Sequence, residues 1–269
     1  MIRGVNLGFP RSVRPARPTD VRVRAAFARS GEGLDYYDGV VVGPETLGAR
    51  ALAPPTLERV LGTLRLLEPD DYVVYVTGFV AAGRRQAGES WRYADILTVL
   101  AAAGELLQPE SYLEIGVRRG RSAAVLASVA PDCAIVGLDL WEEGYAGMEN
   151  PGPELVRREL AKIGHRGSLE LIQGDSHDLL PRLLEERPEL TFDIVTVDGD
   201  HSPEGAERDL RDVLPRLRIG GVLVFDDVRH PAHPELAEVW ERVVVSDRRY
   251  APWQFDGVGY GVALAVRRW

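Results

Sequence analysis

The stretch "FDIVTVDGDH" (residues 192–201) joins a mainly apolar run to a cluster of acidic residues. Such a run is typical of a strand that is covered on both faces of a sheet. Further along, "GGVLVFDD" (220–227) repeats the pattern and ends in two aspartates. Carboxylates gathered at one point repel each other and raise each other's pKa unless a positive charge joins them. We therefore expect a cation beside these two strand ends.

On both sides of this stretch, from residue 91 to residue 245, the sequence predicts alternating strands and helices. Strands are expected at 111–117, 134–140, 169–175, 192–200 and 220–227, and helices at 91–107, 121–130, 152–164, 177–186, 203–217 and 233–245. The last segments, 250–257 and 259–269, predict an antiparallel hairpin around a glycine-rich turn. Apolar strands that alternate with helices indicate a parallel sheet with both faces covered. We expect an α/β fold with a Rossmann-like, doubly wound, mostly parallel seven-stranded sheet.

The first 90 residues lack this regularity, and we assign them to an N-terminal arm and cap segment. Residues 1–30 are rich in arginine and proline and predict an extended or poorly ordered arm. Residues 56–67 have helical spacing of apolar residues, 71–80 predict a strand or a short buried segment, and 81–90 predict a loop. The second domain of this division comprises residues 91–269.

Composition narrows the classes of partner. The 269 residues carry a formal net charge of -9, which argues against nucleic acid and anionic membranes as partners. We find no run of about 18 apolar residues and no secretory signal, so we expect neither a membrane span nor export. The single cysteine, Cys133, excludes an internal disulfide. We expect a cytoplasmic protein that acts on a small molecule and forms a homo-oligomer.

The stretch "YLEIGVRRGRS" (112–122) predicts a strand, a glycine turn and a helix start. Gly116 allows close approach of a ligand, Gly120 opens the helix and Ser122 can cap it. Ligands of open α/β sheets bind beyond the carboxyl ends of the strands, so this loop is a candidate cofactor site. The pattern E-x-G-x-x-x-G lacks the glycine pair of the dinucleotide fingerprint, which disfavours a pyrophosphate cradle. The next two strands end in "GLDLW" (137–141) and "QGDS" (173–176).

Taken in order, these strand ends resemble those of the class I S-adenosylmethionine-dependent methyltransferases, over roughly residues 91–269. The resemblance implies that Gly116 and Gly120 pack on the methionine part of S-adenosylmethionine. It also implies roles for six more residues: Glu114 organises the loop, Ser122 binds the carboxylate, Asp139 binds the ribose hydroxyls, Trp141 flanks the adenosine, and Asp175 and Ser176 lie beside the adenine.

The acidic strand ends suggest a metal. Strands that end in Asp198 and in Asp226-Asp227 can be neighbours, so their carboxylates would converge beside the cofactor loop. Hard oxygen ligands favour Mg²⁺, Ca²⁺ or Mn²⁺ over Zn²⁺. "VDGDHSPEGAERDL" with "GGVLVFDD" resembles the metal-dependent small-molecule O-methyltransferases of the macrolide-sugar and aminocoumarin-sugar type, and more distantly the catechol methyltransferases. In that family the metal ligands match Asp198, Asp226 and Asp227, and Mg²⁺ is the expected ion.

The expected reaction is methyl transfer to a hydroxyl of a small natural product or sugar. His201 is the candidate general base, and Asp200 is an alternative base or a partner for His201. Other interpretations stay open: a metal-independent methyltransferase with His201 as the base, a nucleotide-dependent oxidoreductase, or a non-catalytic scaffold that binds the cofactor. The stretch "HPAHP" (230–234) predicts a loop over the site, because its prolines exclude a helix.

Overall fold

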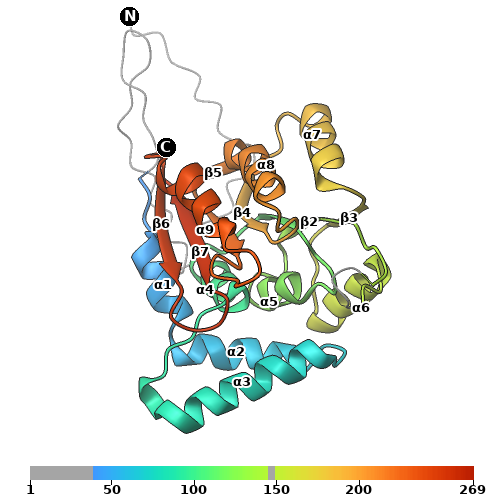
Figure 1. Ribbon diagram of the computed structural model, residues 1–269. Coiled ribbons are helices and arrows are strands. Elements are labelled where there is room, and N and C mark those ends of the chain that lie inside the picture. Colours follow the sequence, from blue (N-terminus) through green and yellow to red (C-terminus); the bar gives the residue numbers. More distant parts are fainter. Residues whose placement is uncertain (1–38, 145–148) are drawn as a thin grey trace, which may run out of the picture.

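The computed structural model describes residues 39–144 and 149–269 (Figure 1). Its centre is a seven-stranded sheet in the order β3-β2-β1-β4-β5-β7-β6. The strands are β1 (Ser111–Ile115), β2 (Ala134–Asp139), β3 (Leu169–Gln173), β4 (Phe192–Val197), β5 (Leu217–Asp226), β6 (Tyr250–Phe255) and β7 (Val262–Arg267). The strands β1 to β5 are parallel, whereas β7 runs antiparallel to both β5 and β6. The expected α/β fold with a terminal antiparallel hairpin is confirmed.

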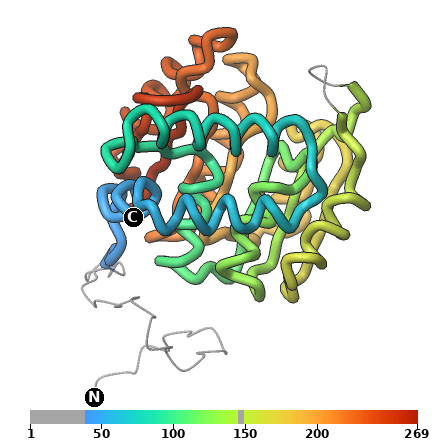
Figure 2. The backbone as a smooth tube through the Cα atoms, turned by 90° about the horizontal axis from the view of Figure 1, so that it is seen from below, coloured from blue at the N-terminus to red at the C-terminus, as the bar shows by residue number. Residues whose placement is uncertain are grey.

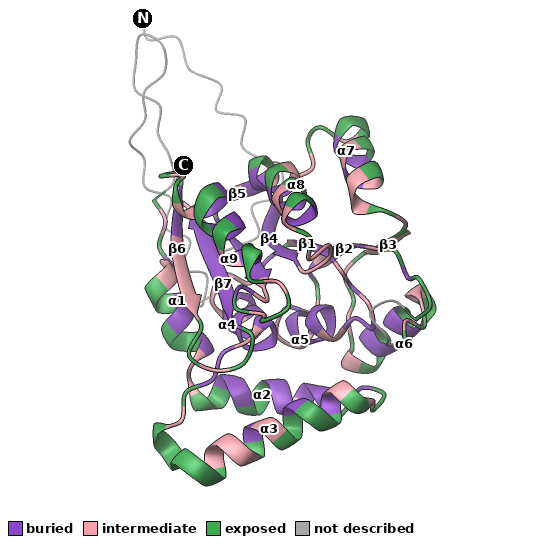
Figure 3. Cartoon of the chain, viewed as in Figure 1, coloured by how far each residue is buried: buried purple, intermediate pink, exposed green. Residues whose placement is uncertain are grey.

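Helices cover both faces of the sheet and create two cores. One face carries α4 (Ile96–Leu107), α5 (Arg121–Val129) and α6 (Pro153–Ile163). The other carries α7 (Ser176–Glu186), α8 (Pro203–Val213) and α9 (Glu235–Trp240), which continues as one π-helical turn, Glu241–Val245. The inner strands and the facing sides of these helices are buried, as Figure 3 shows. Burial on both faces explains why the strands are apolar at nearly every position.

The first helix of this part begins later than the sequence predicts. Asp95 caps α4 by accepting a hydrogen bond from the Thr98 backbone N–H at 2.8 Å, and the Thr98 hydroxyl oxygen accepts from the Asp95 N–H at 3.0 Å. This reciprocal capping box starts the helix at Ile96 instead of residue 91. The preceding Trp91 and Tyr93 stack on each other, with ring centroids 5.3 Å apart.

The cap segment is helical, which contradicts the strand expected at 71–80 and the loop expected at 81–90. It comprises α1 (Pro44–Ala51), α2 (Pro54–Leu64), α3 (Asp71–Ala87) and a short 3₁₀ turn, Gly88–Ser90. The run "VVYV" is typical of strands, but Val73, Val76 and Val80 have helical spacing and are buried on one face of α3. Figure 2 shows α2 and α3 running side by side across one side of the molecule. The N-terminal arm expected at 1–30 lies outside the described residues.

Ion pairs join the cap to the glycine turn that follows β1. Arg119, only 5% exposed, lies 3.1 Å from the Asp70 carboxylate and 3.3 Å from that of Glu68. Arg121 pairs with the same Asp70 carboxylate. Asp70 also caps α3 by accepting a hydrogen bond from the Val73 N–H at 3.0 Å. One aspartate therefore starts a cap helix and pairs with two arginines of the glycine turn.

Among the described residues, no helix combines the length and apolar character that crossing a bilayer requires.

We expect Asp70→Ala to lower the free energy of unfolding by about 2–4 kcal/mol, because it removes a helix cap and leaves two poorly exposed arginines without their shared partner. Urea denaturation measures this change. Glu58→Ala is the matched control, because Glu58 and Arg84 form an exposed ion pair at 2.5 Å that contributes about 0–1 kcal/mol. Equal losses in the two variants would show that Asp70 does not hold the cap.

Candidate functional site

The glycine turn after β1 brings two strand ends into contact. Gly116 has a φ of 90°, and its backbone N–H donates to the Leu138 carbonyl at 2.9 Å. A Cβ atom at Gly116 would lie 1.9 Å from the backbone oxygen of Asp198, so only glycine fits. Gly120 also has a positive φ, 73°, and packs against Val156 of α6. The predicted cofactor loop therefore adjoins the predicted acidic cluster.

Glu114 lies fully buried beneath this loop. One carboxyl oxygen accepts a hydrogen bond from the Ser122 hydroxyl, while Oε2 has no hydrogen-bond partner. Burial, the largest effect, raises the pKa of Glu114 to about 8. A buried carboxyl oxygen without a partner suits a bound amine or another donor. The structure thus directs Ser122 to Glu114, a contact that the sequence did not predict.

Asp139 connects the loops that follow β1 and β2. Its Oδ2 accepts from the Arg118 backbone N–H and its Oδ1 from the Trp141 backbone N–H, both at 2.6 Å. The Trp141 indole N–H donates a hydrogen bond to the Arg118 carbonyl oxygen at 2.9 Å. Arg118 and Trp141 have positive φ angles of 50° and 43°, an uncommon backbone conformation for residues other than glycine. Because Trp141 is buried, its ring supports the two loops from within.

The loop after β3 is fixed by a residue that sequence reasoning missed. Asp175 caps α7 by accepting from the His177 N–H at 2.8 Å, and its side chain is 56% exposed. The Ser176 hydroxyl instead donates to Asp209 at 2.9 Å. Asp209 is fully buried on α8, and burial raises its pKa to about 6. The helical spacing of Asp209 with the apolar residues Ala206 and Val213 was the signal that could have identified it.

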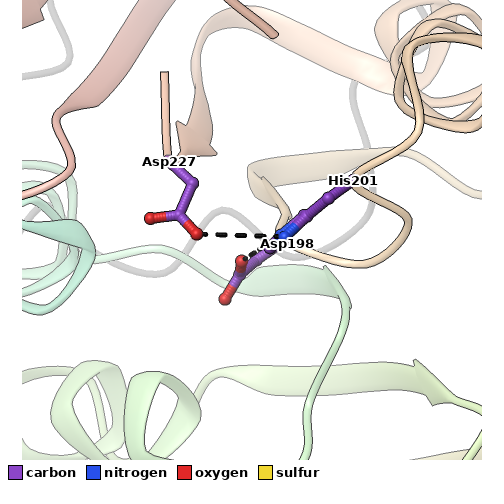
Figure 4. Close-up of side chains that lie close together, drawn as sticks. All are labelled: Asp198, His201 and Asp227. Carbon is purple, nitrogen blue, oxygen red and sulfur yellow. Dashed lines mark hydrogen bonds and ion pairs between the residues drawn. The ribbon is translucent and has the colours of Figure 1, made fainter. Parts of the chain in front are cut away.

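The ends of β4 and β5 bring together Asp198, His201 and Asp227 (Figure 4). The His201 Nε2 lies 3.4 Å from Asp198 Oδ1, and its Nδ1 lies 3.9 Å from Asp227 Oδ2. One possible ligand atom from each residue lies within 4.8 Å of the others. The hydrogen bond to Asp198 raises the pKa of His201. When it is protonated, His201 supplies positive charge between two carboxylates, where the sequence led us to expect a cation.

Asp226 lies outside this group of three but interacts electrostatically with Asp198 and Asp227. Burial raises the pKa of Asp226, followed by the charges of Asp198 and Asp227. Asp227 has a φ of 59°, so the chain turns sharply at the strand end. The predicted ligand set of Asp198, Asp226 and Asp227 stays a prediction. Asp200, the alternative base, accepts a hydrogen bond from the Ser202 N–H at 2.8 Å and so stabilises the turn before α8.

The cap reaches the same cluster through Tyr72 of α3. The Arg121 guanidinium lies over the Tyr72 ring, 4.7 Å from its centroid. Burial raises the pKa of Tyr72, and the charges of nearby aspartates, including Asp226 and Asp198, raise it further. Tyr72 is therefore a neutral phenol beside the acidic cluster. Sequence reasoning missed this residue because it predicted no helix at this position.

Comparison with known proteins agrees with this architecture. Residues 113–228 match the family model described as a methyltransferase domain. Catechol O-methyltransferase B of Danio rerio is 30% identical over 134 residues, which are 49% of this chain and 47% of that protein. This chain therefore spans about half the length of that curated relative.

Two solved structures are similar. The O-methyltransferase TomG from Streptomyces achromogenes, in complex with SAM, is 25% identical, with a TM-score of 0.52 over 76% of this chain and 92% of that one. Cofactor-bound Rv0187 from MTB is 23% identical, with a TM-score of 0.51 over 80% of this chain and 91% of that one. The fold is that of the class I S-adenosylmethionine-dependent methyltransferases, as the sequence predicted.

The environment of Glu114 predicts a pH dependence of stability. Its pKa is about 8 in the folded protein and near 4.5 in the unfolded chain, so the folded state holds an extra proton between these values. Stability contributed by this group therefore falls as pH rises from about 5 to 8, by up to about 1.4 kcal/mol per pH unit. Urea denaturation at several pH values should show a shallower decline for Glu114→Gln.

Glu110→Gln is the control for this comparison, because Glu110 is exposed and should keep the profile of the unmodified protein. Parallel profiles for Glu114→Gln and the unmodified protein would contradict the assignment.

Proposed function

We propose that this chain, a class I methyltransferase by fold, transfers a methyl group from S-adenosylmethionine to a hydroxyl of a small molecule. The observation that carries the proposal is the contact between Gly116 and Asp198, which places the candidate donor loop against the acidic cluster. The 25% identity with TomG, an O-methyltransferase in complex with SAM, supports the choice of donor. The match to a catechol O-methyltransferase supports an oxygen acceptor.

The residues of the first three strand ends fit S-adenosylmethionine. The unpartnered Oε2 of Glu114 suits the amino group of the methionine part. Asp139 lies at the end of β2, where its carboxylate would bind the ribose hydroxyls. Asp175 and Ser176 follow β3 and would lie beside the adenine. Ser122 and Trp141 fit a supporting role better than direct contact, because the first bonds Glu114 and the second is buried.

The acidic cluster also fits a divalent cation. Carboxylate oxygens suit Mg²⁺ or Mn²⁺, and we propose Asp198 and Asp227 as the main ligands, with Asp226 behind them. When bound, such an ion would lower the pKa of the acceptor hydroxyl and help to orient it. His201 in its neutral form would take the hydroxyl proton, and general-base assistance typically contributes about 10²–10⁴-fold to the rate.

One observation favours a second candidate, a metal-independent methyltransferase. His201 already lies between Asp198 and Asp227 and can neutralise part of their charge. In that case the pair of His201 and Asp198 would act as the base, with Asp198 fixing the orientation of the imidazole. The two candidates share the donor site and differ only in the requirement for a cation.

We expect Asp139→Ala to weaken binding of S-adenosylhomocysteine, the demethylated product, by about tenfold to a hundredfold. The reason is the lost hydrogen bonding to a charged group, about 1.5–3 kcal/mol. Isothermal titration calorimetry measures the affinity. Asp178→Ala is the matched control, because Asp178 is exposed on α7. Unchanged affinity in Asp139→Ala would refute the donor site.

We expect Mn²⁺ to bind the unmodified protein, and Asp198→Ala to abolish that binding, because Asp198 is a proposed ligand. Electron paramagnetic resonance of free Mn²⁺ measures this directly, with Asp178→Ala again as the control. His201→Ala should retain Mn²⁺, since the imidazole is proposed as a base. If the unmodified protein binds no Mn²⁺, the metal-independent candidate replaces the metal-dependent one.

A further inference from the structure

A row of aromatic rings leads away from the acidic cluster. The ring of His201 meets His233 with centroids 5.1 Å apart, and His233 meets His230 at the same spacing. His230 in turn contacts Tyr260, with centroids 4.4 Å apart. We call His233, His230 and Tyr260 the ring strip. It begins beside the candidate base and ends at a tyrosine that is 49% exposed.

Backbone hydrogen bonds hold the ring strip in place. The N–H of His230 donates to the Asp227 carbonyl, and that of His233 donates to the His230 carbonyl, both at 3.0 Å. The N–H of Arg229 donates to the Tyr260 carbonyl at 2.7 Å, which joins the hairpin turn to this loop. Pro231 and Pro234 keep the segment out of a regular helix. The rings are therefore held by the main chain that also places Asp227.

The polar atoms of the strip are suited to a neutral ligand. The Nδ1 of His230 accepts a hydrogen bond from the Ala232 N–H at 3.1 Å, which leaves the proton of a neutral ring on Nε2. With Nδ1 as the acceptor, the His230 ring has a single N–H donor and no positive charge, and Tyr260 adds a phenol. Neither residue offers the fixed positive charge that would select an anionic group.

The turn that carries Tyr260 also contacts the other side of the site. A Cβ at Gly259 would lie 3.9 Å from the ring of Tyr93, whose hydroxyl donates to Asp95 at 2.9 Å. An ion pair at 3.0 Å between Arg229 and Asp256 holds the start of the turn. The hairpin turn therefore spans from the start of α4 to the ring strip. Tyr260 therefore lies at the outer end of the ring strip, where its ring can meet a ligand.

We propose that the ring strip binds the body of the acceptor, and that the acceptor is an uncharged, planar hydroxylated compound longer than a single ring. This inference rests on the proposed function, since it places the reacting hydroxyl at Asp198, His201 and Asp227. Tyr260 is exposed and His230 and His233 are half-buried, so the row offers several aromatic surfaces in succession, and such surfaces bind planar rings by stacked or edge-on contact. Tyr260 is then a specificity-determining residue for the distal end of the acceptor.

The test compares a short and a long probe that carry the same pair of hydroxyls. Catechol has one ring, whereas luteolin carries a catechol ring extended by a fused planar ring system. Calorimetry with Mg²⁺, in the presence and absence of S-adenosylhomocysteine, gives both affinities. We expect luteolin to bind at least about tenfold more tightly than catechol, and Tyr260→Ala to weaken luteolin about five- to tenfold while catechol stays within about twofold.

Controls separate recognition from folding. Tyr260→Phe should retain most of the affinity for luteolin, because it keeps the ring. Tyr75→Ala removes another exposed aromatic, on α3, and should change neither probe. Affinity for S-adenosylhomocysteine and the melting temperature should be the same in all these variants, since the strip touches neither Glu114 nor Asp139 in the described residues.

The inference is overturned if luteolin binds no better than catechol, if neither probe binds, or if Tyr260→Ala leaves their ratio unchanged. Each of these results is compatible with normal binding of S-adenosylhomocysteine, so the proposed function would survive. Conversely, absence of S-adenosylhomocysteine binding would refute the proposed function, while the probe ratio in the free protein would still decide the role of Tyr260.

Discussion

The close approach of Gly116 to the backbone of Asp198 is the constraint on which the site depends. Two neighbouring parallel strands, β1 and β4, end at the same edge of the sheet, and their chains then turn in contact. A side chain at Gly116 would push apart the glycine turn that follows β1 and the loop that carries His201. The two halves of the proposed reaction, donor binding and hydroxyl activation, adjoin because this position has no side chain.

Charge balance explains much of the remaining architecture. Asp198, Asp226 and Asp227 lie at neighbouring strand ends. Burial raises the pKa values of Asp226 and Asp227, and the negative charge of Asp198 raises them further. His201, when protonated, would provide part of the compensating charge, and a divalent cation would provide more. Between the cap and the glycine turn the clustered charges are positive: the carboxylates of Asp70 and Glu68 pair there with arginines of the turn. The cap is therefore held against the glycine turn by ion pairs as well as by apolar packing.

The sequence predicted the sheet well because local pattern decides it. Mainly apolar runs such as "FDIVTV" indicate strands with both faces covered, and the glycines and acids that follow mark the strand ends. The same local reasoning failed at α3, where "VVYV" is typical of a strand but packs as one face of a helix. It also missed Asp209, Tyr72 and the contact of Ser122 with Glu114. The position of Tyr72 and the contact of Ser122 with Glu114 depend on which segments meet in space, and local spacing does not contain that information. For Asp209 the helical spacing with Ala206 and Val213 was the available signal.

We propose that the methyl donor binds directly beside the acidic cluster. The most direct measurement is the NMR signal of S-adenosylmethionine labelled with ¹³C at its transferable methyl group, bound to the protein with Mn²⁺ or with diamagnetic Mg²⁺. We expect strong paramagnetic broadening of the methyl signal with Mn²⁺, no such broadening with Mg²⁺, and recovery of the sharp signal in Asp198→Ala. A methyl signal that stays sharp while Mn²⁺ and the donor are both bound would show that the donor does not bind beside the cluster.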